Sequence, residues 1–288
     1  MAKPILSITN PKLGLDILTT EEIQQIHAAT LQIIEQVGVR FPSARALDIW
    51  EAHGARVDRQ KSIVRASPAL IEDALRQAPP AYTLAARDPA QDLPLDGNHV
   101  FLATDGCGVE VLDLHSGARR TSCLQDVADI ARLADATPEI GFHWVAVSAQ
   151  DKPVHTRGLH EIQAVWENST KHVQTESIYS AEEARAAVEM AAAVAGGKEA
   201  LRQRPVLSLM QCSASPLGHD GGSLEAALVA AEHGIPTGFM TMASCLTTAP
   251  ATLAGTLAVG NAEVIAATAL LQLAAPGAPV FYAAAQTA

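Results

Sequence analysis

The sequence predicts an α/β protein: an incomplete (β/α)8 TIM-type barrel that follows an N-terminal extension of helices and short strands. Two observations support this prediction. From residue 121 onward, strand-like segments alternate with helical ones, and parallel strands need a crossover long enough to return to the same edge of the sheet. The apolar strands also carry polar residues at their carboxyl side, namely Ser148, Glu176, Gln211 and Thr241, as at the active-site face of a barrel.

Residues 1–120 are expected to form the N-terminal extension. Apolar residues at helical spacing follow Thr20, and Ser43 and Ser67 each stand where a helix N-cap is expected. From residue 82 to 120 the pattern changes to short strands separated by Asp-Gly, Asp-Pro and Ser-Gly turns. The first region is therefore predicted to be helical and then β-rich.

Residues 121–288 are expected to form the barrel. The strand-like segments are residues 140–147, 172–178, 206–212, 237–242 and 280–284, and the helical ones are 124–136, 155–168, 181–195, 222–233 and 253–274. Each unit takes roughly 30 residues, so about five βα units are present and a closed barrel would need roughly 90 more. An open doubly wound sheet is the alternative, but HWVAVSAQDKP, at the end of the first strand, lacks the Rossmann glycine fingerprint. We expect the front part of a longer barrel.

Composition narrows the possible functions. The net charge of −11 argues against a nucleic-acid binder, which needs a basic face. The four cysteines form no CxxC pair, and no apolar signal segment is evident, so reduced thiols in a cytoplasmic protein are expected. Residues 251–275 are apolar, but they contain Asn261, Glu263 and Gln272, which favours a buried amphipathic helix over a membrane span.

Several segments together resemble the trimethylamine methyltransferase (MttB-like) superfamily. They are LTTEEIQQIHAATLQIIEQVGVRF, ATDGCGVEVLDLHSGARRTSCLQDVADIARLAD, HTRGLHEIQAVWENSTKH, GIPTGFMTMASCLTTAPATLAGTLAVGNAEVIAA and LLQLAAPGAPVFY. The resemblance implies a (β/α)8 barrel with an N-terminal extension. It also implies transfer of a methyl group from a tertiary or quaternary amine, such as trimethylamine or glycine betaine, to cobalt(I). That cobalt belongs to a corrinoid (cobalamin) on a partner protein, and this chain is expected to bind no cofactor or metal tightly itself.

The family is associated with methanogenesis and one-carbon metabolism, and its members continue well beyond the equivalent of Ala288. In the trimethylamine enzymes pyrrolysine lies in that later portion, whereas relatives acting on quaternary amines have an ordinary residue there. Which of the two substrate classes applies is left open by this sequence.

Two carboxylates are the candidate catalytic residues. Asp105, in Thr104-Asp105-Gly106, is expected to face the cationic substrate, with Gly106 beside it; the alternative is a hairpin-turn aspartate, since Asp-Gly between strands is a hairpin signal. Glu176 stands at the carboxyl end of the second strand, where barrel enzymes place catalytic groups. Its alternative is a buried, paired structural carboxylate.

Aromatic and amide side chains on the strands are the candidate substrate-binding residues. Cation–π contacts and a carboxylate suffice to hold a methylated ammonium. Phe142 and Trp144 share one face of the first strand and His143 lies on the other, so one face is expected to reach the lumen. The full set is Phe142, His143, Trp144, Gln211, Phe239 and Tyr282.

Three other interpretations remain open at this point. A zinc site built on Cys212 and Cys245 would match sister families, although no metal-binding spacing supports it. A different barrel enzyme, a lyase or hydrolase, would use Glu176 and His143 as acid and base. An inactive barrel fragment would expose a sheet edge near residues 280–284 and associate with another chain, and a homo-oligomer is possible.

Overall fold

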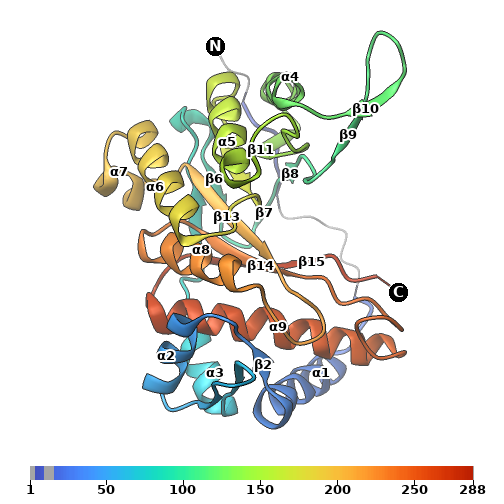
Figure 1. The fold of residues 1–288 in the computed structure, drawn as a ribbon, viewed down its shortest axis with the longest axis vertical. Coiled ribbons are helices and arrows are strands. Elements are labelled where there is room, and N and C mark those ends of the chain that lie inside the picture. Colours follow the sequence, from blue (N-terminus) through green and yellow to red (C-terminus); the bar gives the residue numbers. More distant parts are fainter. Residues whose placement is uncertain (1–3, 10–15, 288) are drawn as a thin grey trace.

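A six-stranded parallel sheet forms the centre of the computed structural model, which describes residues 4–9 and 16–287 (Figure 1). The strand order is β15-β14-β13-β12-β11-β8, and all five pairings are parallel. The strands are β8 (Leu102–Ala103), β11 (Ile140–Trp144), β12 (His172–Thr175), β13 (Leu207–Cys212), β14 (Thr237–Thr241) and β15 (Val280–Ala284). The five strands predicted after residue 121 are all present, in the predicted order.

The sheet winds in one direction only, because β11 to β15 are neighbours in the order in which they occur along the chain. The crossover helices are α4 (Leu124–Ala136), α5 (Arg157–Asn168), α6 (Ala181–Ala195), α8 (Gly221–Glu232) and α9 (Leu253–Ala274). Each contacts the next in that order, as expected when right-handed crossovers place all helices on one face. A doubly wound sheet would reverse direction at a switch point. The result is a curled half-barrel, compatible with part of a TIM-type barrel.

Two elements of this part were not predicted. The short helix α7 (Lys198–Gln203) follows α6. The strand β8 joins the main sheet beside β11, although it precedes the predicted boundary at residue 120. A two-residue strand gives almost no periodic signal, so its membership in the sheet is decided by its neighbour. The division at residue 120 stays a prediction.

The N-terminal helices begin where their capping residues predicted, within one residue. The α1 helix (Thr20–Gln32) continues as a π-turn (Ile33–Val37), and its N-cap is Thr19, which forms a capping box with Glu22. Ser43 caps α2 (Ala44–Ala52) and Ser67 caps α3 (Pro68–Leu75).

Short strands and single helical turns complete the extension. One small sheet contains β2 (Val39–Arg40), β4 (Ile63–Arg65) and β3 (Arg56–Asp58). The antiparallel pairs are β1 (Ile8–Thr9) with β7 (His99–Val100), β5 (Tyr82–Leu84) with β6 (Leu93–Leu95), and β9 (Glu110–Leu112) with β10 (Arg119–Thr121). Two 3-10 turns lie at Pro89–Gln91 and Val154–Thr156.

The α9 helix is the core helix of the fold. It contacts β14 and β15 on one side and α1, α2 and α3 on the other, as the stacking at the bottom of Figure 1 shows. Although α9 is long and apolar enough to cross a membrane, 72% of its most apolar window is buried inside the protein. Burial was predicted correctly, but the amphipathic pattern was wrong: residues 262–267 are buried without interruption. Two packed layers leave this helix no solvent face there.

Candidate active site

The segment that follows β8 runs beside the carboxyl end of β11. The Thr104 hydroxyl donates a hydrogen bond to the Trp144 carbonyl at 2.5 Å, and the Gly108 amide donates to the Ala146 carbonyl at 3.0 Å. Asp105 lies between these anchors and is exposed; its Oδ1 accepts from the Gly106 amide at 2.9 Å. The residues on either side pair with other strands and not with each other, so Asp105 is not in a hairpin turn.

Three of the predicted site residues meet at Gly106. A Cβ atom added there would lie 2.3 Å from Trp144 Nε1 and 2.9 Å from Glu176 Oε1, so only glycine allows both side chains this close. Trp144 ends β11, and Glu176 follows the end of β12, which pairs with β11. The structure therefore brings Asp105, Gly106, Trp144 and Glu176 together at the carboxyl ends of neighbouring strands.

The electrostatic environment favours protonation of Glu176. Its side chain is 6% exposed, and burial raises the pKa of its carboxyl group above the ordinary value. A hydrogen bond from the Cys107 thiol opposes this, while the negative charges of Asp105 and Glu161 raise the pKa further. A cation placed among these groups would restore the ionised form of Glu176.

Three further side chains lie near this cluster; none was predicted as a catalytic or substrate-binding residue, and Cys212 was considered only as a zinc ligand. Tyr179 is half exposed, and burial and the nearby Cys107 and Glu176 raise the pKa of its phenol. Burial and Glu176 raise the pKa of the Cys212 thiol to about 11. The fully buried Glu161 has a pKa raised by burial. Tyr179 follows β12 and Cys212 is the last residue of β13, and this position near a strand end could have identified both, whereas nothing in the helical sequence marks Glu161.

Glu161 supports the loop that follows β11. Its Oε1 accepts hydrogen bonds from the Ala149 amide at 2.7 Å and the Ser148 hydroxyl at 3.0 Å. Ser148 was predicted to be a polar residue at the active-site face, and the structure gives it this role in shaping the loop. Glu161 thus adds a third carboxylate near Glu176, whose pKa its charge helps to raise.

His143 lies on the opposite face of β11 from this cluster. Side chains in register in a parallel sheet share a face, and His143 pairs with Val173, which pairs with Leu207 in the helix-side core. The imidazole is fully buried, neither ring nitrogen has a hydrogen-bond partner among the described residues, and burial lowers its pKa to about 4. Trp144, and not His143, therefore lies on the inner face of the sheet, which is the face opposite the crossover helices.

Phe142 shares the inner face with Trp144 and precedes it by two residues, further from the carboxyl end of β11. It pairs in register with His172, and their ring centroids are 6.4 Å apart in an edge-on arrangement. His172 is itself held by the Ala85 carbonyl and the Ser208 hydroxyl. Phe142 thus belongs to the inner wall of the half-barrel beneath Trp144.

Gln211, Phe239 and Tyr282 are not brought together with the cluster. They are mutually in register and lie on the helix-facing side of the sheet. Phe239 is fully buried in the core that contains α9, and Gln211 donates a hydrogen bond to the Ile178 carbonyl at 2.8 Å. Tyr282 is 51% exposed and lines a groove of about 290 Å³ beside α1 and α9. Alternation along each strand places these side chains on the wrong face for the cluster.

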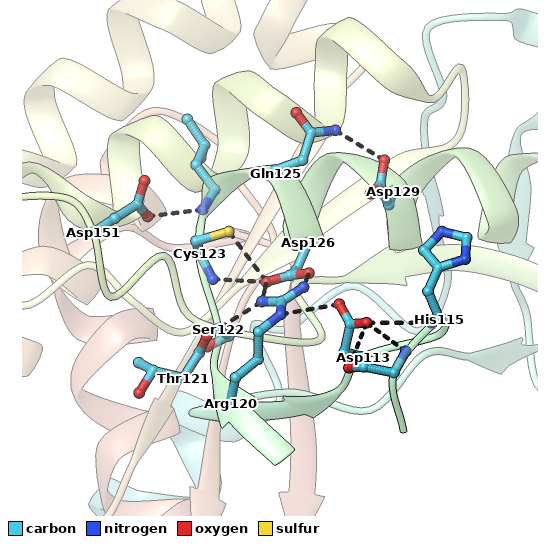
Figure 2. A network of polar contacts seen from close by, with 12 residues as sticks. Asp113, His115, Arg120, Thr121, Ser122, Cys123, Gln125, Asp126, Asp129 and Asp151 are labelled. Atoms are coloured by element: carbon cyan, nitrogen blue, oxygen red, sulfur yellow. Dashed lines mark hydrogen bonds and ion pairs between the residues drawn. The ribbon is translucent and has the colours of Figure 1, made fainter. Parts of the chain in front are cut away.

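The far end of the segment that carries Asp105 is fastened to α4 (Figure 2). In the second strand of the projecting β9–β10 hairpin, Arg120 forms two hydrogen bonds of 2.7 Å with Asp126 and a longer one of 3.3 Å with Asp113. This pairing lowers the pKa of Asp126 to about 2. The Ser122 hydroxyl also donates to the Ser148 carbonyl at 2.6 Å, so both ends of the segment are held against the loops of the sheet.

The cysteines do not form the core of a metal site in the described part of the chain. No group of three or more histidine, cysteine, aspartate and glutamate side chains there could hold a metal ion. Cys245 makes a sulfur contact of 3.4 Å to the Pro250 carbonyl, whereas Cys212 lies by Glu176. The geometry therefore offers a carboxylate and aromatic cluster as the chemically distinctive feature of this face.

Comparison with known proteins agrees with the sequence resemblance. The family model for trimethylamine methyltransferase (MTTB) matches residues 2–288. A trimethylamine methyltransferase (MttB) of Desulfitobacterium hafniense is 35% identical over 95% of this chain and 55% of its own length. A glycine betaine methyltransferase of the same species is 33% identical over 93% and 55%.

An archaeal relative, the trimethylamine methyltransferase MttB2 of Methanosarcina mazei, is 31% identical over 95% of this chain and 56% of its own length. The chain therefore spans about 55% of the length of the curated relatives it matches. The match extends across both the N-terminal extension and the half-barrel. This chain belongs to the trimethylamine methyltransferase family.

Proposed function

We propose that this protein moves a methyl group from a methylated amine, such as glycine betaine or trimethylamine, to the cobalt(I) of a corrinoid carried by a partner protein. The observation that carries the proposal is the convergence of Asp105, Trp144 and Glu176 at Gly106. An indole and carboxylates are the groups that attract a methylated ammonium. The names of the relatives, trimethylamine and glycine betaine methyltransferases, give the substrate class.

The proposed reaction breaks the carbon–nitrogen bond of an N⁺–CH₃ group. The electron pair of this bond stays on nitrogen, so the amine product carries one positive charge less than the substrate. The methyl carbon forms its new bond with an electron pair from cobalt(I), which becomes methyl-cobalt(III). Cobalt(I) supplies the nucleophile, so the residues of this chain have a positioning task. Asp105 and Glu176 hold the cation, and Trp144 presents its ring to the methyl groups. Loss of the charge on nitrogen then weakens the attraction of the site for the product.

The complete barrel and the partner are part of the same proposal. Three further βα units, supplied by additional chain, would close the half-barrel around the inner face that Trp144 and Phe142 line. The corrinoid protein would dock over the carboxyl ends of the strands, where the cluster lies. We place the enzyme in the cytoplasm, where the corrinoid partner and reduced thiols would be found together.

An acid–base enzyme that pairs Glu176 with His143 is less well supported. The two side chains lie on opposite sides of the sheet, because Glu176 approaches Trp144 and His143 points to the helix side. A general base must reach the proton that it removes, so two groups on opposite sides of a sheet cannot act as acid and base on the same substrate.

A methyl-transfer assay tests the proposal. The full chain is incubated anaerobically with cob(I)alamin and trimethylamine or glycine betaine, and formation of methylcobalamin is followed by absorbance. We expect turnover with one of the two amines, and slower turnover in the Asp105→Asn and Glu176→Gln variants. The matched control is Glu182→Gln, an exposed carboxylate on α6. Absence of methylcobalamin with every methylated amine would overturn the proposal and favour the inactive fragment.

A further inference from the structure

A carboxylate is fully buried in the middle of the core helix α9. Glu263 is 0% exposed, and its carboxylate accepts four hydrogen bonds. Oε2 accepts from the hydroxyls of Ser213 at 2.5 Å, Ser215 at 2.8 Å and Thr241 at 2.9 Å, while Oε1 accepts from the Leu217 amide at 2.8 Å. The four donors come from segments that are separated from α9 in the sequence.

Three of these donors belong to the loop that leaves the carboxyl end of β13, and the fourth ends β14, where the next loop begins. Thr241 is the last residue of β14, and the segment from Ser213 to His219 follows β13. Ser213 also accepts a hydrogen bond from the Met242 amide at 3.1 Å, which ties one loop to the other. The His219 ring nitrogen Nε2 lies 3.1 Å from the Glu263 carbonyl oxygen. Glu263 is thus the common anchor of both loops.

Stability alone does not account for this carboxylate. No lysine, arginine or histidine forms an ion pair with Glu263 in the described residues. Burying an anion costs several kcal/mol before its hydrogen bonds offset that cost, and an apolar side chain would fill a core helix without the cost. A buried charged residue in a core that is otherwise apolar is expected where the fold must hold a functional geometry.

The anchored loops adjoin the candidate active site. Cys212, directly before Ser213, lies close enough to Glu176 to have its pKa raised. The Tyr179 carbonyl oxygen is packed against Gly222, where an added Cβ would lie 2.0 Å away. The loop after β13 begins directly after Cys212 and leads into α8, whose first turn contains Gly222, so fixing this loop restrains the side of the cluster that Cys212 and Tyr179 form.

We propose that Glu263 is a positioning residue for the amine site. It touches no substrate; it holds the loops after β13 and β14 so that Cys212 and Tyr179 keep their places beside Glu176. This inference rests on the proposed function for its substrate, but the loop-anchoring part of it can be measured without turnover.

The test compares two changes in the same helix of the full chain. Glu263→Gln removes the anion, and the control Gln272→Met removes another fully buried polar group, which bonds with Ala278 and Gly277 at the far end of α9. We expect both variants to lower Tm. Only Glu263→Gln should also weaken binding of choline, a quaternary ammonium probe, about tenfold and raise KM more than it lowers kcat. It should also speed hydrogen exchange at the Leu217 and Met242 amides.

Equal losses of choline affinity in the two variants, or unchanged exchange at those amides, would overturn the proposal. If Glu263→Gln does not fold, Thr241→Val removes one donor and should give the same changes at smaller amplitude. A full chain that neither binds choline nor transfers methyl groups would refute the proposed function. Faster exchange in Glu263→Gln would in that case still establish Glu263 as the anchor of the loops.

Discussion

Replacing Glu176 by glutamine should remove the dependence of cation binding on pH. Glu176 is nearly buried, and burial together with Asp105 and Glu161 raises its carboxyl pKa. Below that raised pKa the unaltered protein holds Glu176 neutral, and above it the carboxylate is available to a cation. Affinity for a quaternary ammonium is therefore expected to rise with pH through the raised pKa, and binding should release a proton. The Glu176→Gln variant has no such proton to release.

The size of the effect follows from one unit charge at contact distance. Two unit charges about 4 Å apart interact with about 4 kcal/mol at an effective dielectric constant near 20. The methyl groups of the ligand keep its charge somewhat further away, and the exposed side of the cluster adds solvent screening, so about 1.5–3 kcal/mol is expected. That corresponds to about a 10–100-fold loss of affinity above the raised pKa. Below it, the variant and the unaltered protein should bind alike.

Isothermal titration calorimetry with a matched ligand pair measures this directly. Choline carries the ammonium charge, and 3,3-dimethylbutanol has nearly the same shape without it. Titrations across pH, repeated in buffers of different ionisation enthalpy, give both the affinity and the number of protons released. Glu182→Gln, on the exposed first turn of α6, controls for the loss of any one carboxylate.

The same titrating group has an opposite influence on folding. Because the folded protein binds the Glu176 proton more tightly than the unfolded chain does, the contribution of Glu176 to the free energy of unfolding is full below its pKa in the unfolded chain. This contribution is lost as pH rises through its pKa in the folded protein.

The reasoning about cation binding would be refuted if choline and 3,3-dimethylbutanol lost affinity equally in Glu176→Gln. A pH-independent choline affinity in the unaltered protein would refute it as well.

Three further predictions concern the residues that shape the fold around this site. Gly106→Ala should displace the Trp144 ring and lower choline affinity at least tenfold, measured by calorimetry, since the new Cβ would lie 2.3 Å from the indole nitrogen; an unchanged affinity would contradict the observed approach. Lys171→Met should lower the free energy of unfolding by about 3 kcal/mol in denaturant titration, because three backbone carbonyls lose their buried donor, whereas the exposed control Lys198→Met should cost less than about 1 kcal/mol. Arg120→Gln should speed hydrogen exchange and proteolysis in the β9–β10 hairpin with little change in Tm; a hairpin that stays protected would show that Arg120 does not hold it.

Much of the architecture could be predicted because its signals are local. Alternating strand and helix patterns gave the order of elements after residue 121, and serine caps gave the starts of α2 and α3. The helix α9 could be assigned from its length and composition, but the uninterrupted burial of residues 262–267 depends on the layers that pack against it, including α1 and α3. A hydrophobic pattern shows that a helix is buried without showing what covers it.

The candidate site was predicted in part for the same reason. Glu176 could be chosen because it stands at the carboxyl end of a predicted strand, whereas the Thr-Asp-Gly segment around Asp105 is also typical of a hairpin turn. The pairing of β8, β11 and β12 decides that the two carboxylates lie together. Gln211, Phe239 and Tyr282 were chosen by side-chain type, and the face on which each one lies is set by strand register. A shift of one residue in a strand reverses the side to which every side chain points.

The sequence by itself determined the family, the parallel α/β class and the strand end at which Glu176 would lie. Motif, periodicity and turn residues are properties of short segments and can be read without knowing the fold. The tertiary structure alone decided that Trp144 and not His143 faces Glu176, that Glu161 supports the same loop, and that Glu263 gathers two loops from within α9. These contacts join residues far apart in the chain, and only the register and packing of the sheet fix the distances between them.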